Sequence, residues 1–195
     1  MDEVLLERAV EWVEELFASD AGGHDAEHTL RVYRTAMALA ETEPDCDKTV
    51  VALAALLHDA DDYKLFQTEN NANARRFMAG QGVSAETAER VCAAVNAVSF
   101  SRNGARRPDT PEGRIVQDAD RLDAMGAVGV ARTFAYGGEH ARPMDESVRH
   151  FYDKLLRLKD GMNTPAARAE AERRHAFLEA FLEQYRTETE GSLDL

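Results

Sequence analysis

The sequence predicts an all-α protein, a helical bundle of about eight to nine helices. Apolar residues recur at intervals of three and four along most of the chain, which is typical of helices that bury one face. Capping residues, Gly and Pro stand between these segments, where helices begin and end. No stretch alternates strictly between apolar and polar side chains, so no segment favours a sheet.

The helices expected in the first half of the chain are bounded by caps and breakers. Asp47 is a good N-cap for the third helix, and Ser84 is a good N-cap for the fifth. Gly80 and Gly82 are expected to stop the fourth. The five expected ranges are 2–18, 25–43, 48–59, 68–79 and 85–98.

The second half is expected to begin its helices at Thr110-Pro111, a capping residue followed by Pro in the first turn. Small residues after Asp123 suggest close helix contact, and Tyr136-Gly137-Gly138 is expected to open a loop to about Asp145. Further helices are expected over about 146–160 and from Pro165 to about 187. The polar, arginine-containing loop 99–110 is either a lid or a solvated connection.

Charge and cysteine content limit the classes of function. The net charge is −13, from 36 acidic and 23 basic residues. This balance argues against binding to nucleic-acid polymers or membrane surfaces. Cys46 and Cys92 form no CxxC motif, and the amino terminus lacks the pattern of a signal peptide. We therefore expect a cytoplasmic protein with reduced thiols.

The third expected helix has an unusual composition. Eight apolar residues run without a break from Val50 to Leu57 and are followed by His58 and Asp59. The run is shorter than the ~20 residues of a membrane span, so it indicates a helix buried in a globular core. Burying a charge there is costly unless a partner compensates it, and a divalent metal ion would be such a partner.

Other residues of metal-ligand type stand on helices with strong apolar faces. His28 lies on the second expected helix, and the sixth carries Asp118, Asp120 and Asp123. Two imidazoles and two carboxylates suit a first-row divalent ion and would leave coordination positions open for catalysis. The alternative is that each histidine is a hydrogen-bonded core residue and that the other aspartates are solvated or lie behind the ligands.

The pattern His28…His58-Asp59…Asp120 resembles the H…HD…D pattern of the HD superfamily of metal-dependent phosphohydrolases. The aspartate that precedes Arg-Leu is the ligand in that family, which selects Asp120 over Asp118. Longer stretches between residues 24 and 180 are similar to a branch of stand-alone bacterial and archaeal HD proteins, the YpgQ/YedJ-like branch.

This resemblance implies one HD domain over residues 1–187, with a metal core over about 24–125 and a loose tail over 188–195. It implies a single divalent ion, with Mn²⁺ favoured and Mg²⁺, Co²⁺, Ni²⁺, Fe²⁺ or Zn²⁺ as alternatives. The implied ligands are His28, His58, Asp59 and Asp120.

The resemblance also implies roles around the ion. Asp62 is three residues beyond the HD pair, where relatives carry an acid that orients or deprotonates the attacking water, although many have glutamate there. Lys64 is expected to assist catalysis by holding phosphate oxygens. The residues expected to contact the substrate are Arg31, Asp123, Tyr136, Lys154 and Lys159.

The predicted activity is hydrolysis of a small nucleotide by water attack on phosphorus, with conversion of a nucleoside triphosphate to a monophosphate and pyrophosphate preferred. A 5′-nucleotidase or phosphodiesterase is the nearest alternative. A non-catalytic HD module that senses a nucleotide or metal is another. The sequence does not decide the base, the physiological metal or the oligomeric state.

Overall fold

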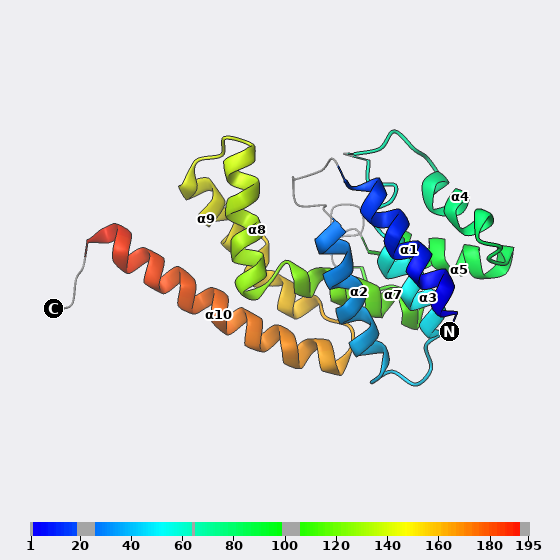
Figure 1. Ribbon diagram of the computed structural model, residues 1–195. Helices are drawn as coiled ribbons and strands as arrows, with labels where there is room; N and C mark the ends of the chain where they lie inside the picture. The colour runs from blue at the N-terminus through cyan, green and yellow to red at the C-terminus, as the bar shows by residue number, and fades with distance from the viewer. Residues whose placement is uncertain (1, 19–25, 64, 99–105, 192–195) are drawn as a thin grey trace. The chain divides into compact units, whose positions relative to one another are not determined.

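The computed structural model describes residues 2–18, 26–63, 65–98 and 106–191. Within these residues the protein has nine α-helices, one 3₁₀-helix and no strand, which confirms the predicted all-α class (Figure 1). The chain forms two compact units, Met1–Asp120 and Arg121–Leu195. The expectation of one domain over residues 1–187 stays a prediction.

The first unit is built around α3, Lys48–Leu57. Every residue of the apolar run from Val50 to Leu57 is fully buried, because α3 packs against α1, α2 and α5. This helix is therefore buried on all sides, as its composition predicts. The other helices of the unit are α1 (Glu3–Leu16), α2 (Ala26–Ala40), α4 (Ala72–Gly80), α5 (Ala85–Asn96) and most of α7 (Pro111–Asp123).

Three helix starts are capped as the sequence predicts. The Asp47 side chain accepts from the backbone N–H groups of Thr49 and Val50 at the start of α3. Ser84 accepts from Thr87 at the start of α5, at 3.1 Å. At the start of α7, the Thr110 hydroxyl accepts from the N–H of Gly113, also at 3.1 Å. These bonds satisfy donors that a helix leaves unpaired in its first turn.

The fourth helix begins later than residue 68, where it was expected. Asn70 and Asn71 have φ angles of 55° and 54°, a left-handed conformation that cannot belong to a right-handed helix. The helix starts at Ala72, and Asp61 accepts from the backbone N–H groups of Asn73 and Ala74 at 2.9 and 3.0 Å. The cap thus comes from a residue about ten positions earlier, which local sequence patterns do not indicate.

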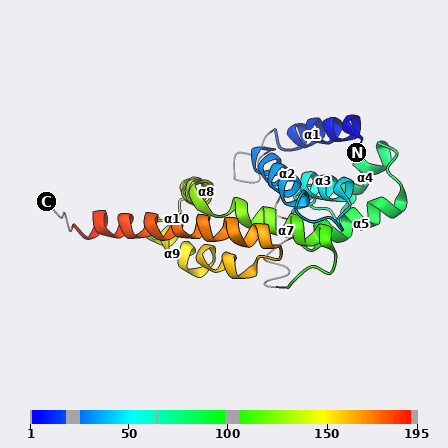
Figure 2. The ribbon, with the colours of Figure 1, turned by 90° about the horizontal axis from the view of Figure 1, so that it is seen from below.

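The second unit consists of α8 (Gly126–Glu139), α9 (Met144–Asp153), the 3₁₀-helix η1 (Leu155–Gly161) and α10 (Pro165–Glu190). Figure 2 shows α8 end-on against the side of α10, so these two helices cross. Phe134, Phe151 and Phe181 meet between α8, α9 and α10, with ring centroids 5.7–6.0 Å apart. This aromatic cluster is the centre of the unit's core.

Three expectations for the second unit are wrong. The Tyr136-Gly137-Gly138 segment does not open a loop, because α8 continues to Glu139. A Cβ atom on Gly137 would lie 2.5 Å from Ser147 Oγ, so this glycine allows α9 to approach α8. The helix expected over 146–160 is divided at Lys154, whose φ of −134° ends α9. The last helix extends to Glu190, so residues 188–190 are helical and not loose.

Among the described residues, no helix combines enough length with enough apolar character to cross a membrane.

Two glycines of α8 should respond in opposite ways to alanine. A Cβ on Gly129 would collide with the backbone carbonyl of Ala124, which cannot rotate away, so Gly129→Ala should lower the unfolding free energy by about 1–3 kcal/mol. Gly138 has no atom within 4 Å of the new Cβ, so Gly138→Ala should raise stability by up to about 1 kcal/mol. Urea unfolding followed by circular dichroism would measure both, and an unchanged or raised stability of Gly129→Ala would contradict the packing at Gly129.

Candidate metal centre

Three helices bring four residues of ligand type together in the first unit. His28 lies in the first turn of α2, His58 and Asp59 directly follow α3, and Asp120 lies near the end of α7. The Nε2 atoms of His28 and His58 are 3.2 Å apart. One carboxylate oxygen of Asp59 lies 3.3 Å from His58 Nε2 and 3.5 Å from His28 Nε2, and Asp120 Oδ1 lies 3.5 Å from His28 Nε2.

These distances fit a shared divalent ion. Two donor atoms about 2.1 Å from an octahedral ion and 90° apart are about 3.0 Å from each other. One donor atom each from His28, His58 and Asp120 lie within 4.8 Å of one another, and Asp59 approaches both imidazoles. Imidazole nitrogens with carboxylate oxygens, and no thiolate, are the donor set of Mn²⁺, Fe²⁺, Co²⁺ or Zn²⁺ sites.

The tautomer of His58 is set by the backbone of its own helix. Its Nδ1 lies 2.8 Å from the carbonyl oxygen of Ala55, which can only accept a hydrogen bond, so Nδ1 carries a proton. In the neutral ring Nε2 then has a free lone pair directed toward His28 and the carboxylates. A bond of this kind to the second ring nitrogen is what orients a metal-binding histidine.

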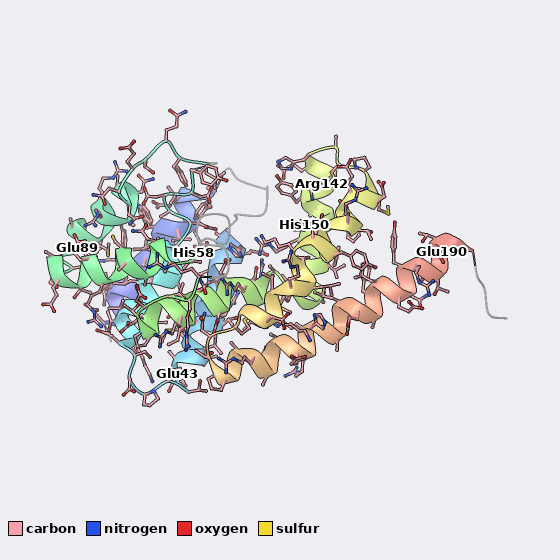
Figure 3. The ribbon with its side chains drawn as sticks, turned by 180° about the vertical axis from the view of Figure 1, so that it is seen from behind. Glu43, His58, Glu89, Arg142, His150 and Glu190 are labelled. Atoms are coloured by element: carbon pink, nitrogen blue, oxygen red, sulfur yellow. The ribbon has the colours of Figure 1, made fainter. Side chains whose placement is uncertain are left out.

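The cluster is buried and its charges are coupled. The side chains of His28 and His58 are each 2% exposed, Asp59 is 12% exposed and Asp120 is 28% exposed, so the carboxylates mark the accessible side. Figure 3 shows His58 among the helices of this unit. Burial by itself lowers the pKa of His58, but the charges of Asp59 and Asp120 outweigh it and raise the pKa to about 9. A positive charge among these side chains is therefore strongly favoured.

The raised pKa gives a pH dependence for the metal-free protein. The folded state holds the His58 proton more tightly than the unfolded state, so the resulting stability is fully present below the ordinary pKa of 6.5 and is lost as the pH rises through about 9. Urea unfolding with a chelator present, over this pH range, should show the unfolding free energy falling more steeply for the wild type than for His58→Gln. Equal slopes would show that the carboxylates do not stabilise the imidazolium.

The pattern of ligands agrees with a comparison against known families. Residues 25–125, which contain all four residues of the cluster, match the family model described as HD domain. The chain belongs to the HD domain family. Its helical fold is similar to that of an HD-superfamily hydrolase, and its histidine–histidine–aspartate cluster is of a kind that can hold a metal ion.

Individual HD domain proteins are similar over nearly the whole chain. YpgQ of Bacillus subtilis is 41% identical over 188 residues, which cover 92% of this chain and 91% of YpgQ. A crystal structure of that YpgQ in complex with ADP matches with a TM-score of 0.81 and 37% identity, covering 94% of this chain and 97% of the other. An HD-superfamily hydrolase from Bacillus thuringiensis matches with a TM-score of 0.79 and 38% identity, covering 98% and 100%. These likenesses support a hydrolase.

Other residues predicted for the site lie near the HD pair in the first unit. The backbone N–H of Asp62 donates to the carbonyl of Asp59 at 3.0 Å, which places Asp62 in the turn that follows the HD pair. Asp62 is half-buried there. Arg31 is one turn after His28 on α2 and lies 3.7 Å from the exposed Glu27. Lys64 lies outside the described residues. Asp61 is half-buried, and its carboxylate caps α4.

The remaining predicted contacts lie in the second unit, and their role stays a prediction. Asp123 is buried in an ion pair of 2.6 Å with Arg132. The Tyr136 ring is stacked on His140 at 3.8 Å, with the Arg142 guanidinium 4.9 Å from its centre. Lys159 pairs with Glu172 at 3.5 Å, and the half-buried Lys154 is the C-cap of α9. The pairing of Asp123 with Arg132 is a tertiary contact that no motif indicates.

Proposed function

We propose that this HD domain protein is a metal-dependent nucleotide phosphohydrolase that converts a nucleoside triphosphate to a monophosphate and pyrophosphate. The observation that carries the proposal is the convergence of two imidazoles and two carboxylates in one buried cluster, in which His28 Nε2 lies 3.2–3.5 Å from the other three groups. The ADP complex of the similar Bacillus subtilis YpgQ supports a nucleotide as the ligand. The acidic chain as a whole argues for a small substrate and against a nucleic-acid polymer.

The proposed ligands of one divalent ion, Mn²⁺ in the preferred case, are His28, His58, Asp59 and Asp120. Such an ion would supply Lewis acidity, by which the pKa of a coordinated water falls and phosphate charge is neutralised. Each of these side chains has a further task. Burial keeps the imidazoles free of competing water, and the bond from His58 to Ala55 fixes the direction of its lone pair.

Asp62 is proposed to orient the attacking water and to receive its proton. Its backbone is bonded to Asp59 in the turn after α3, so it is anchored beside the HD pair. A carboxylate in this position can act as a general base. Aspartate is shorter than the glutamate expected at this position, so positioning of the water is proposed as the main role.

Cations are proposed to hold the phosphate oxygens. Arg31 is three residues after His28 and so projects from a nearby part of α2. Its pair with the exposed Glu27 is a surface contact worth little, which phosphate oxygens could replace. Lys64 is proposed for the same role. In the second unit, Asp123, Tyr136, Lys154 and Lys159 are proposed to contact the rest of the nucleotide.

The test is product analysis with defined metal content. Metal-stripped protein would be given Mn²⁺ and a panel of nucleoside mono-, di- and triphosphates and cyclic nucleotides, with pyrophosphate and phosphate assayed separately. Pyrophosphate from a triphosphate, absent in a His58→Ala variant, would support the proposal. Phosphate from monophosphates would reassign the protein as a 5′-nucleotidase, and opening of a cyclic nucleotide as a phosphodiesterase. Binding without turnover would indicate a sensing module.

A further inference from the structure

A buried carboxylate at the start of α7 joins three helices of the first unit. Glu112 is 6% exposed, and its Oε1 accepts from the backbone N–H of Asp47 and from Arg90 Nη2, each at 3.0 Å. The other terminal nitrogen of Arg90 donates to the Asp47 carboxylate at 2.9 Å. Asp47 is the N-cap of α3 and Arg90 lies on α5, so Glu112 connects the starts of α3 and α7 to the middle of α5.

The surrounding packing holds the same turn of α7 in place. A Cβ atom on Gly113 would lie 3.0 Å from Pro108 Cβ and 3.7 Å from the Ala94 backbone, so α7 lies very near α5 there. Ala94 is one turn after Arg90 on α5. Further along, Gln117 Nε2 donates to the carbonyl of Ala97 at 2.8 Å. Residues later in α7 therefore contact residues later in α5 and just after its end, so the two helices run in the same direction.

The Glu112 junction and the metal cluster lie at opposite ends of the same helices. Glu112, Val116 and Asp120 are spaced by four residues on one side of α7, and Val116 is fully buried. On α3, His58 follows Asp47 by eleven residues, which is three turns and returns to the same side of the helix. Both helices thus start at the junction and carry their ligands at the far end.

The charge of Glu112 makes this junction specific. Negative charge is favoured in the first turn of a helix, and the N–H of Asp47 would otherwise be unpaired where α3 begins. A buried carboxylate is costly unless it is fully hydrogen-bonded and paired. The Glu112 carboxylate, the Asp47 N–H and the Arg90 guanidinium must therefore stay in contact. Burial, and next to it the charge of Glu112, raises the pKa of the Cys46 thiol.

We propose that Glu112 is a positioning residue of the metal centre. By holding the first turn of α7 to the start of α3, it sets the longitudinal register at which Asp120 meets His28 and the HD pair. Without it, α7 can slide or rotate while its apolar face stays buried, and Asp120 moves away from the imidazoles. This inference rests on the proposed metal-dependent function.

The experiment compares metal affinity in variants of the full chain. Mn²⁺ binding would be measured by electron paramagnetic resonance, Co²⁺ coordination by its visible spectrum, and stability by thermal unfolding of the metal-free protein. Glu112→Ala should weaken Mn²⁺ binding about 10-fold and change the Co²⁺ spectrum. Glu112→Gln, whose carbonyl can still accept both hydrogen bonds, should keep the affinity within about 3-fold and the spectrum unchanged.

Two control variants separate positioning from general destabilisation. Glu89 is the neighbour of Arg90 on α5 and pairs with Arg75 of α4 at 2.6 and 2.9 Å, so Glu89→Ala removes an ion pair that does not involve α7 (Figure 3). Val13→Ala opens the buried contact of α1. Both should lower the melting temperature and leave the Mn²⁺ affinity and Co²⁺ spectrum unchanged.

Each outcome decides the inference. If Glu112→Ala keeps the wild-type Mn²⁺ affinity and Co²⁺ spectrum, the positioning role of Glu112 is overturned, while the proposed metal centre still stands. If Val13→Ala loses as much Mn²⁺ affinity as Glu112→Ala, the loss is an effect of lower stability and the positioning role is again overturned. Absence of metal binding by the wild type would overturn the proposed function as well. If Glu112→Ala does not fold, Glu112→Asp keeps the charge on a shorter side chain, and wild-type metal binding by that variant would overturn the inference.

Discussion

Replacing His58 with alanine should abolish Mn²⁺ binding at the cluster and lower nucleotide hydrolysis by about 10³-fold or more. The ring is buried between His28 and two carboxylates, so its loss removes a donor and leaves the negative charges of Asp59 and Asp120 uncompensated. A Lewis acid supplies several kcal/mol to a phosphoryl transition state, which corresponds to a change of this size. Metal titration and turnover with Mn²⁺ would be measured on the same samples.

His175→Ala provides the matched control. His175 is buried, as His58 is, but it lies on α10 in the second unit and pairs with Glu179 at 3.3 Å. Its truncation removes a buried imidazole of equal size, and it should lower stability without changing metal affinity. If His58→Ala retained metal binding and activity, or if both variants lost them equally, the cluster would not be the catalytic metal centre.

Asp62→Asn should lower hydrolysis by about 10²–10⁴-fold while Mn²⁺ binding stays at the wild-type level. The carboxamide has nearly the same shape but cannot accept a proton at neutral pH, and general-base assistance contributes about this much to a rate. Turnover under saturating Mn²⁺ would be compared with a direct metal titration.

The neighbouring carboxylate separates catalysis from local structure in this experiment. Asp61 caps α4 through the N–H groups of Asn73 and Ala74, so Asp61→Asn loses one cap bond and about 1 kcal/mol of stability. Its hydrolysis rate should remain near the wild type. Loss of metal in Asp62→Asn would instead make Asp62 a ligand, and full activity would exclude it as the base.

The sequence alone determined the helical class, the buried central helix and the residue pattern of the cluster. The unbroken apolar run from Val50 to Leu57 indicates a helix buried in the core, and that is its structure. The caps at Asp47, Ser84 and Thr110 form between residues two or three apart, so local sequence specifies them. Helices with strong apolar faces indicated that His28, the HD pair and an aspartate of the sixth expected helix could meet, and the resemblance to the HD superfamily selected Asp120.

Tertiary structure decided the features whose partner is far away in sequence. In the sequence Gly137 resembles a helix breaker, but in the structure it lies within α8 and Ser147 of α9 packs against it. In the sequence Asp61 resembles a solvated acid, but in the structure its carboxylate caps α4. Glu112 looks like an ordinary first-turn acid, yet its partners are 65 and 22 residues away. Local patterns report hydrogen bonds and periodicity within one element, whereas the register between elements depends on which surfaces meet when the chain is folded. The positions of the four residues of the cluster relative to one another belong to that second kind of information.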